Sequence, residues 1–79
     1  MISDIMATQI NVQINREFYS AYLYLALSTE AEGMNLRGTG AWFLAKHHEE
    51  MMHAMKMVRY LLDLGAEVTL AGVTAPPPK

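Results

Sequence analysis

The chain has 79 residues and no cysteine, and its six lysine and arginine residues against eight aspartate and glutamate residues give a net charge of −2. The lack of cysteine excludes disulfide bonds and thiolate metal ligands. Because no cluster of basic residues could follow a phosphate backbone, nucleic acid is not an expected partner. Apolar residues make up 52% of the sequence and charged residues 18%, which indicates surface that is buried against another subunit.

The sequence has neither a signal-peptide pattern at its amino terminus nor an apolar run of roughly 18 residues, the length that spans a bilayer. We therefore expect a cytoplasmic protein without a membrane partner. A chain of this length forms one small domain, residues 1–79. Such a domain buries only about 60% of the surface that its unfolded chain exposes, so we expect additional burial through association with a second chain.

Two long helices are predicted. Ser3 is a suitable N-cap, and apolar residues recur after it at helical spacing without a proline, which predicts a helix over about residues 4–32. A second helix is predicted over about residues 39–64. The turn between them, residues 33–38, is short enough to make the two helices antiparallel.

Residues 66–79 are predicted to form an extended tail, because residues 75–79 contain three consecutive prolines, which a helix cannot accommodate. The predicted fold is therefore all-α: an antiparallel two-helix hairpin, treated as a single half-domain, that dimerises into a four-helix bundle.

Each predicted helix carries a glutamate in the stripe of residues that it turns toward the other helix. Alternating spacings of three and four place Glu17 four residues before Ala21 in one stripe and Glu50 four residues before Ala54 in the other. An ionised carboxylate in an apolar core costs several kcal/mol unless it is paired or binds a cation. The two glutamates therefore predict a metal site.

His53 follows Glu50 by one helical turn and could supply a nitrogen ligand. At about 1.5 Å per residue from the turn, Glu17 lies about 22 Å along its helix, and Glu50 and His53 lie about 18 and 22 Å along theirs. The three side chains therefore meet at one height and offer ligands suited to a first-row metal. A twofold axis through this point would give four carboxylates and two histidines, the ligand set of di-iron and di-manganese bundles.

The sequence resembles the first half of the bacterial and archaeal non-haem ferritins. Residues 11–25 (NVQINREFYSAYLYL) resemble the first helix of that family, and residues 49–54 (EEMMHA) resemble the second. The likeness continues through residues 40–43 and into residues 73–77. It covers essentially the whole chain but only about half of the family's length.

This resemblance implies a ferritin-like four-helix bundle and a role for several residues. Glu17, Glu50 and His53 would bind iron, with Glu50 bridging two metal ions. Tyr24 would be the tyrosine beside the ferroxidase centre, and Glu49 would be a ligand of an auxiliary iron site. The implied function is that of a ferroxidase, an oxidoreductase in which a homodimer, possibly assembled further, holds two irons and oxidises Fe(II) to Fe(III) with O2 or H2O2.

Several alternatives remain open from the residues alone. The glutamates of the stripes could be salt-bridged at an interface instead of binding metal. The hairpin could be a non-catalytic pairing module, either for a separate second half or as a haem-binding dimer. Met51 aligns with the methionine that ligates haem in bacterioferritins, but non-haem ferritins often carry methionine there, so haem is not expected. A peroxide-scavenging relative of the rubrerythrins would need a further carboxylate, for which Glu30 and Glu49 are candidates.

Overall fold

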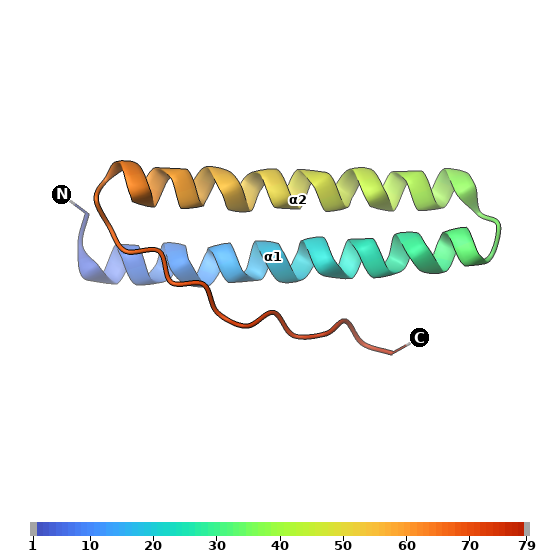
Figure 1. Cartoon of the computed structure of the whole chain (residues 1–79), viewed down its shortest axis with the longest axis horizontal. Coiled ribbons are helices and arrows are strands. Elements are labelled where there is room, and N and C mark those ends of the chain that lie inside the picture. Colours follow the sequence, from blue (N-terminus) through green and yellow to red (C-terminus); the bar gives the residue numbers. More distant parts are fainter. Residues whose placement is uncertain (1, 79) are drawn as a thin grey trace.

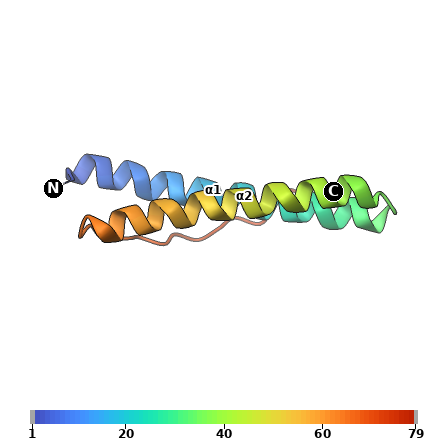
Figure 2. The same cartoon turned by 90° about the horizontal axis from the view of Figure 1, so that it is seen from above.

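The structure is a computed structural model that describes residues 2–78, so Met1 and Lys79, the ends of the predicted domain and tail, lie outside the described residues. Two helices form the fold, α1 (Asp4–Gly33) and α2 (Arg37–Asp63). They run antiparallel as a hairpin, and the extended tail that follows α2 runs along α1 (Figure 1). Figure 2 shows that the helices cross at a shallow angle near the middle of the hairpin.

The start of α1 is set by its N-cap. The Ser3 hydroxyl accepts a hydrogen bond from the backbone N–H of Met6 at 3.1 Å, and Asp4 places a negative charge in the first turn, where the helix dipole favours it. After the helix, Asn35 takes a left-handed conformation with φ of 59°. The N–H of Leu36 then bonds to the carbonyl of Ala31 at 2.9 Å, which closes a Schellman motif.

The second helix begins at Arg37, two residues before the expected start. The reason is that the turn is tighter than predicted: the N–H of Gly40 already bonds to the carbonyl of Leu36 at 2.8 Å, although no side chain caps this end. At the other end Gly65 takes a left-handed φ of 71°, and the N–H of Ala66 bonds to the carbonyl of Leu61 at 2.9 Å. Both helices thus end in the same type of backbone cap.

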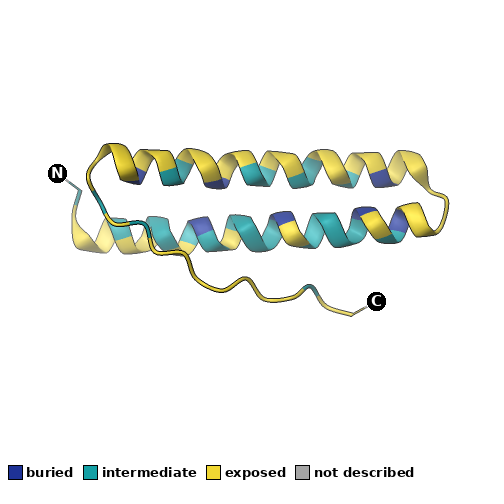
Figure 3. Ribbon diagram, viewed as in Figure 1, coloured by how far each residue is buried: buried dark blue, intermediate teal, exposed yellow. Residues whose placement is uncertain are grey.

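The core lies along the seam between the helices (Figure 3). It is narrow and made largely of small residues, which let the two helices approach closely. Its buried members are Ile14, Ala21, Ser28, Ala31, Gly40, Ala54 and Leu61. Two side chains reach a backbone carbonyl across the seam: the Ser28 hydroxyl donates to the carbonyl of Gly40 at 2.8 Å, and His47 Nδ1 lies 2.7 Å from the carbonyl oxygen of Ala21.

The tail after α2 is held against α1 by one side chain. The Asn11 amide donates to the carbonyl of Glu67 at 3.0 Å and accepts a hydrogen bond from the N–H of Thr69 at 2.8 Å. Further along, the prolines of residues 76–78 border a groove beside Leu23. Within residues 2–78, neither helix is both long and apolar enough to cross a membrane.

Much apolar surface remains exposed on this hairpin. Trp42, Met52, Met55 and Tyr60 on α2 are each more than half exposed, and Ile5 on α1 is 74% exposed. Patches of this kind usually mark surfaces that another chain covers. The structure is thus an all-α hairpin, and its association with a second copy stays a prediction.

Candidate metal centre

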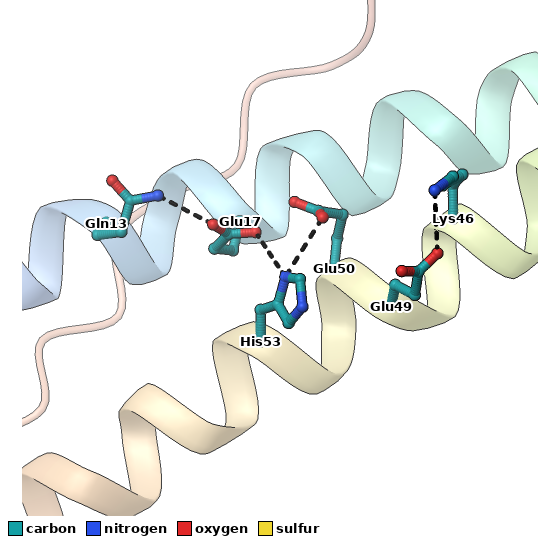
Figure 4. A network of polar contacts seen from close by, with 6 residues as sticks. All are labelled: Gln13, Glu17, Lys46, Glu49, Glu50 and His53. Carbon is teal, nitrogen blue, oxygen red and sulfur yellow. Dashed lines mark hydrogen bonds and ion pairs between the residues drawn. The ribbon is translucent and has the colours of Figure 1, made fainter.

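The fold brings together three of the residues predicted to bind metal. Glu17 comes from the middle of α1, and Glu50 and His53 come from successive turns of α2 (Figure 4). One ligand atom from each side chain lies within 4.8 Å of the others. His53 Nδ1 is 3.4 Å from Glu50 Oε1 and 3.7 Å from Glu17 Oε2. The equal height expected from residue counting is therefore found, while metal binding by the three stays a prediction.

Solvent reaches one side of the cluster, mainly at His53. The side chains of Glu17 and Glu50 are 16% and 22% exposed, whereas that of His53 is 53% exposed. When both carboxyl groups are ionised, the buried Glu17 Oε2 has no hydrogen-bond partner among the described residues. Because an unpartnered buried carboxylate oxygen is costly, this atom fits a cation as its missing partner. Two carboxylate oxygens and one imidazole nitrogen also suit a divalent first-row metal.

The two carboxyl groups hold their protons differently. The pKa of Glu50 is raised above its ordinary value, first because a proton on this carboxyl is shared with Glu17, and then because of burial and the negative charge of Glu17. The pKa of Glu17 is lowered, mainly because Glu50 acts as its hydrogen-bond donor, although burial opposes this effect. Without a cation, the pair thus retains a proton on Glu50 more readily than an isolated glutamate would.

This proton predicts the pH dependence of metal binding. A divalent ion at the cluster must displace the Glu50 proton, so affinity should fall as the pH is lowered, and should begin to fall at a higher pH than for an ordinary glutamate. Below the raised pKa, the proton displaced from Glu50 by itself weakens binding by about tenfold per pH unit, and any other protonated ligand adds to this slope. Calorimetric titration with Zn(II) over a pH series, in buffers of different ionisation enthalpy, would measure both the slope and the protons released. A pH-independent affinity would contradict this prediction.

Gln13 belongs to the cluster although sequence reasoning did not single it out. Its side-chain amide donates to Glu17 Oε1 at 2.9 Å (Figure 4). The available signal was the spacing of four residues, which places the two side chains on adjacent turns of one helix face. Polar residues are common at such positions, so the spacing alone did not distinguish Gln13 from other surface residues.

Glu49 is not brought into the cluster. Its carboxylate pairs with Lys46 of the same helix at 3.3 Å, and the Glu49 side chain is 53% exposed (Figure 4). The Lys46 ammonium also lies 5.2 Å from the centroid of the Trp42 ring. The auxiliary iron role of Glu49 therefore stays a prediction, and in this arrangement the side chain would have to release Lys46 to take it up.

Tyr24 and Met51 lie in different surroundings. The Tyr24 ring stacks on that of Phe43 from α2, with centroids 6.2 Å apart and planes inclined by 29°. Met51 lines a shallow groove of about 640 Å³ on α2, together with Met52, Met55 and three basic side chains. The catalytic role of Tyr24 and the haem role of Met51 both stay predictions.

A helical hairpin that presents glutamate, glutamate and histidine at its mid-length has the architecture of half a ferritin-like domain. The sequence matches the ferritin-like domain of the ferritin family over residues 7–79. The chain therefore belongs to the ferritin family, and the resemblance inferred from its sequence is confirmed.

Individual relatives support this assignment. The chain is 38% identical over 76 residues to the bacterial non-heme ferritin of Campylobacter jejuni, covering 96% of this chain and 46% of that protein. The open-pore ferritin of the archaeon Archaeoglobus fulgidus superposes on 98% of the chain with a TM-score of 0.94 and 42% identity, which covers 48% of the ferritin chain. The Chlorobium tepidum ferritin gives 0.93 and 34%, over 100% of this chain and 48% of the ferritin. The chain thus spans about half the length of these relatives.

Proposed function

We propose that two copies of the chain form a four-helix bundle about a twofold axis through the cluster, bind two Fe(II) ions there, and oxidise them to Fe(III). The observation that carries this proposal is the convergence of Glu17, Glu50 and His53 within 4.8 Å, with the buried Glu17 Oε2 left without a partner. Family membership supports iron as the substrate.

Pairing of two copies follows from the ligand count and from the exposed surface. Three protein ligands fill only half of the positions of a six-coordinate first-row metal. A second copy would supply another Glu17, Glu50 and His53, which completes the ligand set of carboxylate-bridged bundles. It would also cover apolar surface that one hairpin exposes, so one interface would serve both the site and the fold.

The chemistry assigns a role to each ligand. In this dimer the Glu50 carboxylates would bridge the two irons, while each Glu17 and each His53 would bind one iron, and the remaining positions would admit the oxidant. Hard carboxylate oxygens favour Fe(III) over Fe(II), which drives the oxidation. Two Fe(II) ions give up one electron each, and these reduce O2 with two protons to H2O2, or reduce H2O2 with two protons to two water molecules.

The test is native mass spectrometry during an anaerobic Fe(II) titration, because it reports the oligomer and the metal count together. The wild-type chain should appear as a dimer that takes up two irons. The Glu50→Ala variant should lose this uptake, because the bridging carboxylates are gone. After O2 is admitted, the absorbance of Fe(III) should rise faster in the wild type than in Glu50→Ala, whose unbound Fe(II) oxidises only at the uncatalysed rate.

Glu67→Gln is the matched control, because Glu67 is an exposed residue of the tail and its side chain lies outside the cluster. This variant should bind two irons per dimer as the wild type does. Wild-type chains that stay free of iron would refute the ferroxidase proposal, and the chain would then be interpreted as a non-catalytic helical pairing module. Iron uptake by monomers would instead refute the shared site.

A further inference from the structure

Gln13 is joined to the cluster by one hydrogen bond whose direction is fixed by chemistry. An ionised carboxylate only accepts hydrogen bonds, so the Gln13 side chain must turn its NH2 group, and not its carbonyl oxygen, toward Glu17. The Nε2 to Oε1 distance of 2.9 Å is that of a good hydrogen bond. Both residues lie on α1 four positions apart and are partly buried, so the helix itself holds the pair in register.

The two oxygens of Glu17 are therefore not equivalent. Oε1 is occupied by the Gln13 amide. When Glu50 is ionised, as metal binding requires, the buried Oε2 has no hydrogen-bond partner among residues 2–78, and it lies on the side of His53. In Figure 4, Gln13 and His53 flank Glu17 on opposite sides. A metal that approaches between Glu17, Glu50 and His53 thus meets one free carboxylate oxygen.

We propose that Gln13 is a positioning residue for the metal site: by occupying Oε1 of Glu17, it makes this carboxylate bind through Oε2 alone and keeps a coordination position open. This inference rests on the metal site of the proposed function. Groups that hydrogen-bond to metal ligands orient them, and their loss typically weakens metal binding by roughly 10- to 100-fold. A Glu17 released from Gln13 could rotate and chelate with both oxygens, which would fill a position that the oxidant needs.

Anaerobic Co(II) titration tests this proposal without relying on iron oxidation. The visible bands of Co(II) gain intensity as its coordination number falls, so they report how Glu17 binds. Gln13→Met keeps the length and helix preference of the side chain but removes the donor. The variant should still bind two Co(II) per dimer, with affinity lowered about tenfold or more and with weaker visible bands. Gln13→Ala should show the same change of spectrum.

Gln9→Met is the matched control, since Gln9 is an exposed glutamine one turn earlier on α1, and its Co(II) affinity and spectrum should equal those of the wild type. Far-UV circular dichroism of all variants should be unchanged. Wild-type affinity and spectrum in Gln13→Met would overturn the positioning role while leaving the metal site intact. Failure of the wild type to bind Co(II) would overturn the proposed function and this inference together.

Discussion

Zn(II) is expected to raise the melting temperature of the wild-type protein on the order of 10 °C at a free metal concentration 100 times the dissociation constant. A ligand that binds only the folded state stabilises it by about 2.7 kcal/mol per site at that concentration. The proposed dimer of two 79-residue chains falls in the range of 150–250 residues, for which each kcal/mol moves the melting temperature by about 2–4 °C. The two sites of that proposed dimer together give the expected rise. Differential scanning calorimetry at fixed protein concentration, with and without Zn(II), measures it.

Replacing Glu50 by leucine should change both the stability of the metal-free protein and the response of its melting temperature to Zn(II). The metal-free variant should be more stable than the metal-free wild type, on the order of 1 kcal/mol, because a carboxyl group in a largely apolar seam is replaced by an apolar side chain. Its melting temperature should no longer respond to Zn(II), whereas Glu67→Leu should respond as the wild type does. A full Zn(II)-dependent rise in Glu50→Leu would show that the metal stabilises the protein at some other place.

The sequence was most informative where one residue type conflicts with its surroundings. Glu17 and Glu50 interrupt stripes of apolar residues, and that conflict, with the one-turn spacing to His53, was enough to predict which side chains meet. Helix rise is nearly constant, so counting residues from the turn gave their height. The hairpin followed from the same periodicity and the short turn; the start of α2 differed by two residues, and the end of each helix differed by one.

The contacts that the sequence could not predict depend on the direction in which a side chain points, and not on the height of its residue along the helix. Gln13 and Glu49 stand at equally unremarkable helix positions, yet Gln13 bonds to Glu17 and Glu49 turns away to Lys46. Rotamers of exposed and half-exposed side chains are selected by neighbours across the seam and by competing charges. Such rotamers follow no periodic pattern in the sequence. The hydrogen bonds of the Asn11 side chain to the tail were not predicted either, since they join segments far apart in the chain.

Leu61→Ala is expected to destabilise the protein by about 2–5 kcal/mol, the usual cost of truncating a fully buried leucine to alanine. Leu61 has no exposed surface, and with Ile14 it is the largest fully buried side chain of the described residues. Domains of this size are held by only a few kcal/mol, so the variant should lose most of its helical signal in mild urea. Urea unfolding followed by circular dichroism at fixed protein concentration measures the difference.

The adjacent Leu62→Ala is the control, because Leu62 is 48% exposed on the same helix and its truncation should cost less than about 1 kcal/mol. Equal losses in the two variants would contradict the assigned core. Zn(II) should restore part of the helical signal of Leu61→Ala, since metal binding to the folded state is linked to folding. Zn(II) should no longer restore this signal when Glu50→Ala is added to Leu61→Ala. The reason is that Zn(II) is expected to stabilise the fold only by binding at the cluster, which then lacks Glu50.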